Sequence, residues 1–292
     1  MTVIEAMLYE KIPDGSVRCG VCPHRCRIRE GGRGVCGVRE NRGGILYALN
    51  YGLTAAAAVD PIEKKPLYHF LPGTRIYSFS TVGCNLRCAW CQNWELSQHP
   101  KPDRPVAGEP VAPAEHVRRA LAAGCPSIAY TYAEPTIFVE YALETMKLAR
   151  DAGLRNVWVT NGYMTKETLA RILPWLDAAN VDVKGPAGRV YEAYCGAGAE
   201  PVLDIVAAMC AGGVHVEATT LVVPGVNDAE ADLRAVAEEL VRSAGPDVPW
   251  HVTRFFPAWK MFRTPATPLS VLRRAERIGR EAGLSTIHLG NV

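Results

Sequence analysis

From residue 76 onward, short apolar runs alternate with longer segments in which apolar residues recur at helical spacing. The short runs are rich in Val, Ile and aromatic residues, as expected for buried strands. The longer segments repeat an apolar residue every three or four positions, which is typical of helices that cover a sheet. Glycines that close helices support these boundaries, at Gly124, Gly153 and Gly283.

This alternation predicts six strand-helix units. The predicted strands are 76–82, 127–132, 156–160, 180–184, 214–222 and 249–255, with a short last strand at 286–289. The predicted helices are 114–123, 136–152, 166–178, 201–211, 229–243 and 268–282. Such a pattern indicates a parallel sheet with helices outside it. Six units are too few for a closed eightfold barrel, so we expect an α/β fold with a partial, open (β/α)6 TIM-like barrel over residues 74–292. A doubly wound sheet is the alternative, although the chain has no G-x-G-x-x-G turn.

Residues 1–73 are predicted to form an N-terminal cysteine-rich extension and a connector. The extension carries a C-x2-C-x3-C-x9-C pattern, formed by Cys19, Cys22, Cys26 and Cys36. Four thiolates can close a tetrahedral zinc site or hold an auxiliary 4Fe–4S cluster, and the spacing does not choose between them. Reduced thiols packed among glycines are the alternative. His24 lies inside the set and could replace one cysteine.

A second set of thiols follows the first predicted barrel strand directly, as Cys84, Cys88 and Cys91. Thiolates bind soft metals, but a closed zinc site or a fully ligated cubane needs four protein ligands. Three ligands would leave one iron of a 4Fe–4S cluster open to the amino and carboxylate groups of a methionine-type cofactor. Incidental core cysteines or half of a zinc site are the competing interpretations.

Composition and charge limit the classes of protein and the cellular compartment in which such thiol sites occur. The chain has 292 residues, of which 48% are hydrophobic and 21% charged, with a net charge of +2. A net charge this small does not indicate a surface that binds nucleic acid. No apolar segment reads as a signal peptide or a membrane span. The chain has ten cysteines, most of them clustered, which favours metal ligands in a reducing cytoplasm over disulfides.

The stretch CNLRCAWC, residues 84–91, resembles the C-x3-C-x-aromatic-C signature of radical S-adenosylmethionine (SAM) enzymes. The longer text TVGCNLRCAWCQNWELSQ is similar to the AmmeMemoRadiSam system radical SAM enzymes, relatives of the pyruvate formate-lyase activating enzymes. The resemblance covers nearly the whole chain and implies a 4Fe–4S cluster, SAM, and a reductant such as flavodoxin or ferredoxin. It also implies that the connector, residues 60–73, lies across the barrel mouth. Family members often continue past the final GNV, so a C-terminal tail can be missing.

The resemblance also suggests residues that bind the cofactor. Trp90 fills the aromatic slot beside the adenine. Tyr132, Ala133 and Glu134 stand where many relatives have glycine-glycine-glutamate to bind the methionine amine. Both glycines are replaced here, so only the backbone role and Glu134 carry over; a helix N-terminal acid is the competing role of Glu134.

Further strand ends complete the implied cofactor site. Asn161 belongs to a Thr-Asn-Gly turn, and Asp182 and Lys184 form an Asp-x-Lys motif whose side chains share one strand face. A structural ion pair is the other interpretation of that motif. Val223, before the turn at Pro224, is expected to wall the adenine, although core packing explains it equally well.

Four residues are candidates for contact with a substrate: His69, His251, Arg254 and Cys195. A satisfied core histidine is the alternative for His251, and Cys195 could donate a hydrogen atom in radical chemistry. Together these features predict an enzyme that reductively cleaves SAM to a 5′-deoxyadenosyl radical and abstracts hydrogen from a small molecule, a peptide or a protein. A non-catalytic iron–sulfur or zinc electron-transfer protein is the competing hypothesis.

Overall fold

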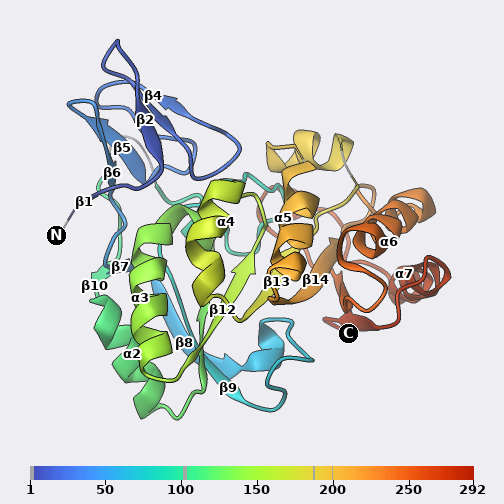
Figure 1. Ribbon diagram of the computed structural model, residues 1–292. Helices are drawn as coiled ribbons and strands as arrows, with labels where there is room; N and C mark the ends of the chain where they lie inside the picture. The colour runs from blue at the N-terminus through green and yellow to red at the C-terminus, as the bar shows by residue number, and fades with distance from the viewer. Residues whose placement is uncertain (1–2, 101–103, 187, 199) are drawn as a thin grey trace.

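The computed structural model describes residues 3–100, 104–186, 188–198 and 200–292. Its centre is an eight-stranded sheet in the order β16-β15-β14-β13-β12-β11-β9-β8 (Figure 1). From β9 to β16 all neighbouring strands are parallel. These strands are β9 (Arg75–Ser80), β11 (Ser127–Tyr130), β12 (Arg155–Thr160), β13 (Ala178–Asp182), β14 (His215–Val222), β15 (Trp250–Arg254) and β16 (Ile287–Gly290). The predicted partial barrel is confirmed.

Helices cover the outer face of this sheet, as Figure 1 shows. They are α2 (Pro113–Ala122), α3 (Val139–Asp151), α4 (Lys166–Ile172), α5 (Glu200–Ala211), α6 (Glu230–Ala244) and α7 (Leu269–Glu281). Short helical segments are α1 (Trp94–Ser97), η1 (Ile62–Lys64), η2 (Pro135–Phe138), η3 (Leu173–Trp175), η4 (Tyr191–Cys195) and η5 (Trp259–Met261). A side-chain cap fixes the start of α4, because the Thr165 hydroxyl accepts a hydrogen bond from the Thr168 N–H. The predicted helix 166–178 was too long, because η3 ends it and Ala178 already belongs to β13.

One strand of the barrel sheet was missed. Strand β8 (Ala56–Pro61) pairs antiparallel with β9, from Ala56 opposite Ser80 to Pro61 opposite Arg75. The barrel sheet therefore begins before residue 74. An alanine-rich run gives little strand signal, and this one is fixed by the ladder it forms with β9.

The N-terminal extension consists of small antiparallel sheets. β1 (Ile4–Glu5), β6 (Ile45–Ala48) and β5 (Arg39–Arg42) form one, and β2 (Tyr9–Lys11), β3 (Val17–Cys19) and β4 (Arg27–Ile28) form another. β7 (Leu53–Thr54) pairs with β10 (Glu109–Pro110). The extension is joined to the barrel by a buried ion pair, in which the Arg39 guanidinium donates to both carboxylate oxygens of Glu140 on α3 at 2.5 and 2.6 Å.

The connector, residues 60–73, contributes both to the barrel core and to the pocket at the strand ends, where Lys64 and Lys65 are among the lining residues. Its residues Ile62 and Leu67 are fully buried, and they form one cluster with residues of four strands: Ile76, Ala129, Val157 and Ala178. Ile76 and Ala178 stand at the amino ends of β9 and β13. The apolar side chains of the connector therefore complete the core between these strands, and its two lysines extend to the pocket.

None of the helices in the described part of the chain combines the length and the apolar character that crossing a bilayer requires.

Candidate functional site

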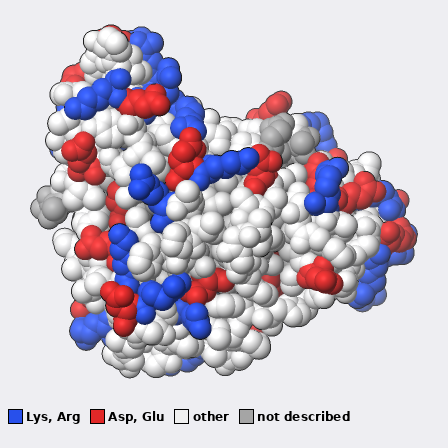
Figure 2. Space-filling view, in the orientation of Figure 1, with Lys and Arg blue, Asp and Glu red and all other residues white. Residues whose placement is uncertain are grey.

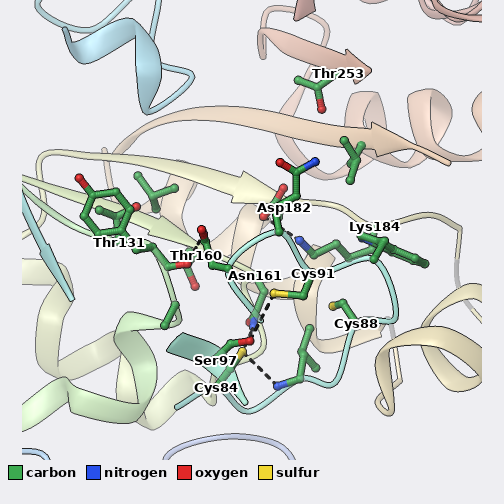
Figure 3. A pocket seen from close by; sticks show the side chains of 18 of the residues that line it. Cys84, Cys88, Cys91, Ser97, Thr131, Thr160, Asn161, Asp182, Lys184 and Thr253 are labelled. Atoms are coloured by element: carbon green, nitrogen blue, oxygen red, sulfur yellow. Dashed lines mark hydrogen bonds and ion pairs between the residues drawn. The ribbon is translucent and has the colours of Figure 1, made fainter. Parts of the chain in front are cut away.

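A pocket of about 320 Å³ lies where the parallel strands end. All three thiols of the 84–91 loop line it, together with residues that follow six further strands of the sheet. In Figure 3 the thiols occupy one side of the pocket, and Asp182 and Lys184 approach it from β13. Side chains from separate strands converge here because parallel strands all end at one edge of the sheet.

The thiol loop is held by its backbone and by a glycine. Gly83 has φ +104°, and a Cβ at this position would stand 2.9 Å from the carbonyl oxygen of Cys36 in the extension. The N–H groups of Arg87 and Ala89 donate to the carbonyls of Cys195 and Tyr194 at 2.8 and 2.9 Å. The loop is therefore fixed between the N-terminal extension on one side and η4 on the other.

The three thiols have different surroundings. Cys84 accepts a hydrogen bond from the Leu86 N–H at 3.3 Å, and burial raises the pKa of its thiol well above the ordinary value. Cys91 lies 3.3 Å from the Ser97 hydroxyl, and burial also raises its pKa. A hydrogen bond from the Cys195 thiol lowers the pKa of Cys88, which makes Cys88 the most readily ionised of the three.

Asp182 and Lys184 form an ion pair inside the pocket. The Lys184 Nζ lies 2.7 Å from the Asp182 carboxylate, with 12% of the lysine side chain exposed. Burial acts to lower the pKa of Lys184, but the charges of Asp182 and Cys88 outweigh it and raise the pKa above its ordinary value. The Lys184 backbone is fixed as well, because its N–H donates to the Tyr191 hydroxyl and its carbonyl accepts from Asn227. The pocket thus carries a paired, charged wall facing the thiols.

Glu134 stands behind the pocket wall and holds two neighbouring strand ends together. Its carboxylate is fully buried and accepts hydrogen bonds from the Thr136 N–H and hydroxyl, the Thr160 hydroxyl at 2.7 Å and the Asn161 N–H at 2.8 Å. Burial raises the pKa of Glu134 in spite of these donors. Asn161 then reaches the thiol loop, donating to the Asn85 side-chain oxygen at 2.9 Å.

Tyr132 has a left-handed backbone, with φ +64°. Such a conformation costs a non-glycine residue on the order of 1 kcal/mol. Asn93, just past the thiol loop, donates to the Tyr132 carbonyl at 2.7 Å, and the Lys65 ammonium lies 4.5 Å from the centre of the Tyr132 ring. Contacts from two other segments therefore hold Tyr132 in the strained conformation at the edge of the pocket.

The radical SAM superfamily model matches residues 78–236, which include the thiol loop and five strands of the sheet. The chain belongs to the radical SAM superfamily. An uncharacterized protein of Methanocaldococcus jannaschii is 44% identical over 288 residues, covering 99% of this chain and 85% of that protein. The 7-carboxy-7-deazaguanine synthase of Thermococcus kodakarensis is 29% identical over 132 residues, covering 39% of this chain and 51% of that protein.

Two solved structures share the fold at low sequence identity. A domain of a pyruvate-formate lyase-activating enzyme from Bacteroides vulgatus has a TM-score of 0.50 at 16% identity, and the match covers 56% of this chain and 98% of that domain. Streptococcus suis SuiB, bound to its precursor peptide SuiA, has a TM-score of 0.56 at 11% identity, with 73% of this chain and 47% of SuiB covered. These likenesses support the radical SAM fold.

Membership of the radical SAM superfamily implies a 4Fe–4S cluster and SAM. The donor set fits that cluster, because the three thiols line one pocket and each thiolate of a cubane binds a different iron. Within residues 3–100, 104–186, 188–198 and 200–292, no three His, Cys, Asp or Glu side chains are arranged to share one metal ion. The three thiolates of the 84–91 loop would each bind a separate iron, so their sulfur atoms do not have to meet at one point.

The structure brings most of the sequence-predicted cofactor residues of this radical SAM enzyme to the pocket. Those that line it are Trp90, Tyr132, Ala133, Asn161, Asp182 and Lys184. Glu134 is behind the wall. Val223 is fully buried and does not line the pocket, whereas Leu221, two residues earlier on β14, does. The residue that lines the pocket here is therefore Leu221, two positions before the predicted Val223.

The four substrate candidates lie outside the pocket lining. His251 donates to the buried Glu217 carboxylate at 2.6 Å, and the His69 ring lies 2.8 Å from His288. Arg254 donates through Nε to the Thr267 carbonyl at 2.7 Å. Cys195 is fully buried behind Cys88. His251 therefore has the surroundings of a satisfied core histidine, and Cys195 contacts a thiol of the loop.

The four thiols of the N-terminal extension surround one small cavity of about 10 Å³. The Val35 N–H donates to the Cys26 sulfur at 3.5 Å, and burial raises the pKa of Cys36 to about 11. The charges of Cys19, Cys26 and Cys36 also raise the pKa of Cys22, after burial as the larger cause. His24 is not among the lining residues; its ring lies 2.7 Å from the carbonyl oxygen of Asn85, in the thiol loop.

Lys64 and Lys65 of the connector, which could have been a solvated link or a substrate contact, line the pocket. Further pocket residues escaped the sequence analysis: Leu86, Gln92, Asn93, Ser97, Thr131, Val159, Thr160, Leu221, Thr253 and Asn291. Four of these lie in or just past the thiol loop, and the other six stand at the ends of strands. The only available signal was position, since Thr131, Thr160, Leu221 and Thr253 stand at the carboxyl ends of β11, β12, β14 and β15.

Proposed function

We propose that this radical SAM enzyme cleaves SAM reductively in the pocket at the strand ends and uses the product to abstract hydrogen from a substrate. The observation that carries the proposal is the convergence of three thiols on one loop with the Asp182–Lys184 pair in a single pocket. A non-catalytic electron-transfer protein would require the thiols but gives no role to a charged pair facing them.

Cys84, Cys88 and Cys91 would hold the cluster. When bound, the cluster supplies one electron that breaks a carbon–sulfur bond of SAM and yields methionine and a 5′-deoxyadenosyl radical. Cys88 is the thiol best prepared for ligation, since the Cys195 hydrogen bond favours its thiolate. Cys195 is then a positioning residue for Cys88.

The remaining pocket residues would bind and orient SAM. Asp182 and Lys184 match the opposite charges of its methionine moiety, so that each of these paired charges would gain a second partner. The backbone at Tyr132 and Ala133 offers polar groups at the pocket edge, and the Asn161 side chain lies beside Cys84, 3.7 Å from its sulfur. Trp90 and Leu221 supply apolar surface for the adenine.

The substrate belongs to one of two classes. The resemblance of the thiol loop to activating enzymes favours a glycine on a partner protein, from which hydrogen is removed to leave a glycyl radical. A small molecule or peptide is the other class. A reductant such as flavodoxin or ferredoxin would deliver the electron. The extension would carry an auxiliary cluster at Cys19, Cys22, Cys26 and Cys36, or zinc, for which these thiols would have to move closer to a common point.

The test is anaerobic reconstitution with iron and sulfide, reduction with dithionite, addition of SAM and an assay for 5′-deoxyadenosine. Wild type should form it and Cys88→Ala should not, because that variant lacks one of three ligands. Cys125→Ala is the matched control, since Cys125 is a buried thiol outside the pocket and should leave the yield unchanged. A fully loaded, reduced wild type that forms no deoxyadenosine and binds no SAM would contradict the proposal.

A further inference from the structure

An exposed segment after β15 combines aromatic rings with cations beside the thiol loop. Phe256 is 42% exposed and Phe262 is 63% exposed, which is unusual for side chains of this size on a surface. Each cation of the segment lies over a neighbouring ring: Arg254 over Phe256 at 5.0 Å, Lys260 over Trp259 at 4.5 Å and Arg263 over Phe262 at 5.3 Å. We call residues 254–263 the aromatic–basic segment.

The segment carries net positive charge with no compensation of its own. Residues 254–267 contain three basic and no acidic residues. Among the ion pairs of the described residues none involves Arg254, Lys260 or Arg263. By contrast, acidic and basic side chains are interspersed over the face shown in Figure 2. A basic, apolar surface of this kind is complementary to an acidic protein.

The segment is held in shape before any partner arrives. The Thr267 hydroxyl accepts from the Phe255 N–H and donates to the Val222 carbonyl, which closes the base of the segment. Trp259 has a left-handed backbone, with φ +43°, at the turn that presents Lys260. Preorganised surfaces lose less conformational entropy on binding.

The contact between this segment and the thiol loop indicates which kind of partner the segment would bind. The Lys260 N–H donates to the carbonyl oxygen of Ala89 at 3.2 Å, and Ala89 lies between Cys88 and Cys91. No residue from 254 to 263 lines the pocket. The segment therefore contacts the thiol loop without lining the pocket, a position that suits a carrier that passes an electron to the loop.

We propose that the aromatic–basic segment is the docking surface for an acidic one-electron donor protein of the flavodoxin or ferredoxin class. The proposal rests on the proposed function. Each docking event would oxidise the donor by one electron and reduce the cluster held by the thiol loop by one electron. The hydrogen bond from Lys260 to Ala89 gives a short path between the docked surface and Cys88.

The test compares two reductants on the reconstituted protein, with cluster reduction followed by the loss of visible absorbance. Reduced flavodoxin must dock, whereas dithionite is small and bypasses docking. In Lys260→Glu/Arg263→Glu the rate with flavodoxin should fall about tenfold or more, as expected when charges that steer association are reversed. The rate with dithionite should stay at the wild-type value.

Matched controls keep the result specific. Arg171→Glu/Arg273→Glu makes the same charge change at exposed arginines of α4 and α7, and should keep the wild-type rate with both reductants. Phe256→Ala/Phe262→Ala tests the apolar part and should slow flavodoxin alone. Flavodoxin binding, measured by calorimetry at two salt concentrations, should weaken in the charge-reversed variant and not in the control.

Two outcomes would overturn the inference. Unchanged reduction by flavodoxin in Lys260→Glu/Arg263→Glu would mean that the donor docks elsewhere. Equal slowing with dithionite would mean that the segment maintains the thiol loop and receives no partner. Failure of the proposed function is distinguishable, because the wild type itself would then form no deoxyadenosine with dithionite.

Discussion

The buried carboxylate of Glu134 accepts a hydrogen bond from the N–H of Asn161 at 2.8 Å, and so ties the end of β11 to the end of β12. Glu134 also accepts from the Thr160 hydroxyl at 2.7 Å. Asn161 contacts the thiol loop through Asn85. A residue that does not line the pocket thus orients two that do.

Glu134→Gln should weaken SAM binding more than it weakens the fold. The glutamine side chain has an amide NH2 group where Glu134 has a second acceptor oxygen. One of the groups that now donates to Glu134 would therefore lose its hydrogen bond, which costs about 1–3 kcal/mol for a buried group. Thr160 and Asn161, which line the pocket, would then be held less firmly, so the Kd for SAM should rise about tenfold. Calorimetry on the reconstituted protein measures this Kd. The exposed Glu95→Gln, beside the thiol loop, is the control. An unchanged Kd would show that Glu134 only caps η2.

The Arg39–Glu140 pair should be essential for joining the extension to the barrel. Glu140→Ala leaves Arg39 buried without its partner, and breaking a buried pair in this way costs about 3–5 kcal/mol. Urea unfolding should show this loss, together with earlier proteolysis of residues 1–50. The double variant Arg39→Leu/Glu140→Leu removes both charges and should recover much of the stability. If the single and double variants lose equally, packing and not charge explains the effect.

Stability should fall below neutral pH because of His116. Its ring is fully buried, stacks on Phe79 at 3.8 Å and contacts the hydroxyls of Tyr141 at 2.6 Å and Tyr77 at 2.9 Å. Burial, with a smaller contribution from the Arg119 charge, lowers its pKa from 6.5 to about 3.

Between those two pKa values the unfolded chain binds a proton that the folded chain excludes. This contribution to stability is therefore complete above pH 6.5 and is lost by up to about 1.4 kcal/mol per pH unit as the pH falls toward 3. His116→Gln should flatten the pH dependence of the urea midpoint between pH 7 and pH 5. The exposed His99→Gln should leave the slope as in wild type. A slope that persists in His116→Gln would assign it to other groups.

The extension should contribute metal beyond the iron of the first site. Cys22→Ser/Cys26→Ser removes two of the four thiols around the small cavity and should lower the total content of zinc or iron, measured by mass spectrometry. Iron bound through Cys84, Cys88 and Cys91 should remain, and deoxyadenosine formation with it. Cys125→Ser/Cys210→Ser, at thiols outside both sets, is the control. Equal metal content in all three proteins would mean that the extension holds reduced thiols only.

The sequence by itself determined the features that depend on neighbours along the chain. The thiols Cys84, Cys88 and Cys91 follow one strand on one short loop, so their spacing alone predicts a shared site. The strand–helix alternation predicts a partial barrel because period and length are local properties. Asp182 and Lys184 were predicted to point to the same side because residues two apart on a strand share a face.

Only the tertiary structure decided which groups from distant segments meet. The alanine-rich β8 is a strand because β9 pairs with it, and the connector joins the barrel core because Ile62 and Leu67 pack among residues of four strands. Leu221 and not Val223 lines the pocket because the register of β14 with β13 and β15 sets which position along the strand lies level with the pocket. Lys260 meets Ala89 across 171 positions of the chain. Such contacts arise from packing between elements, and no pattern of neighbouring residues encodes them.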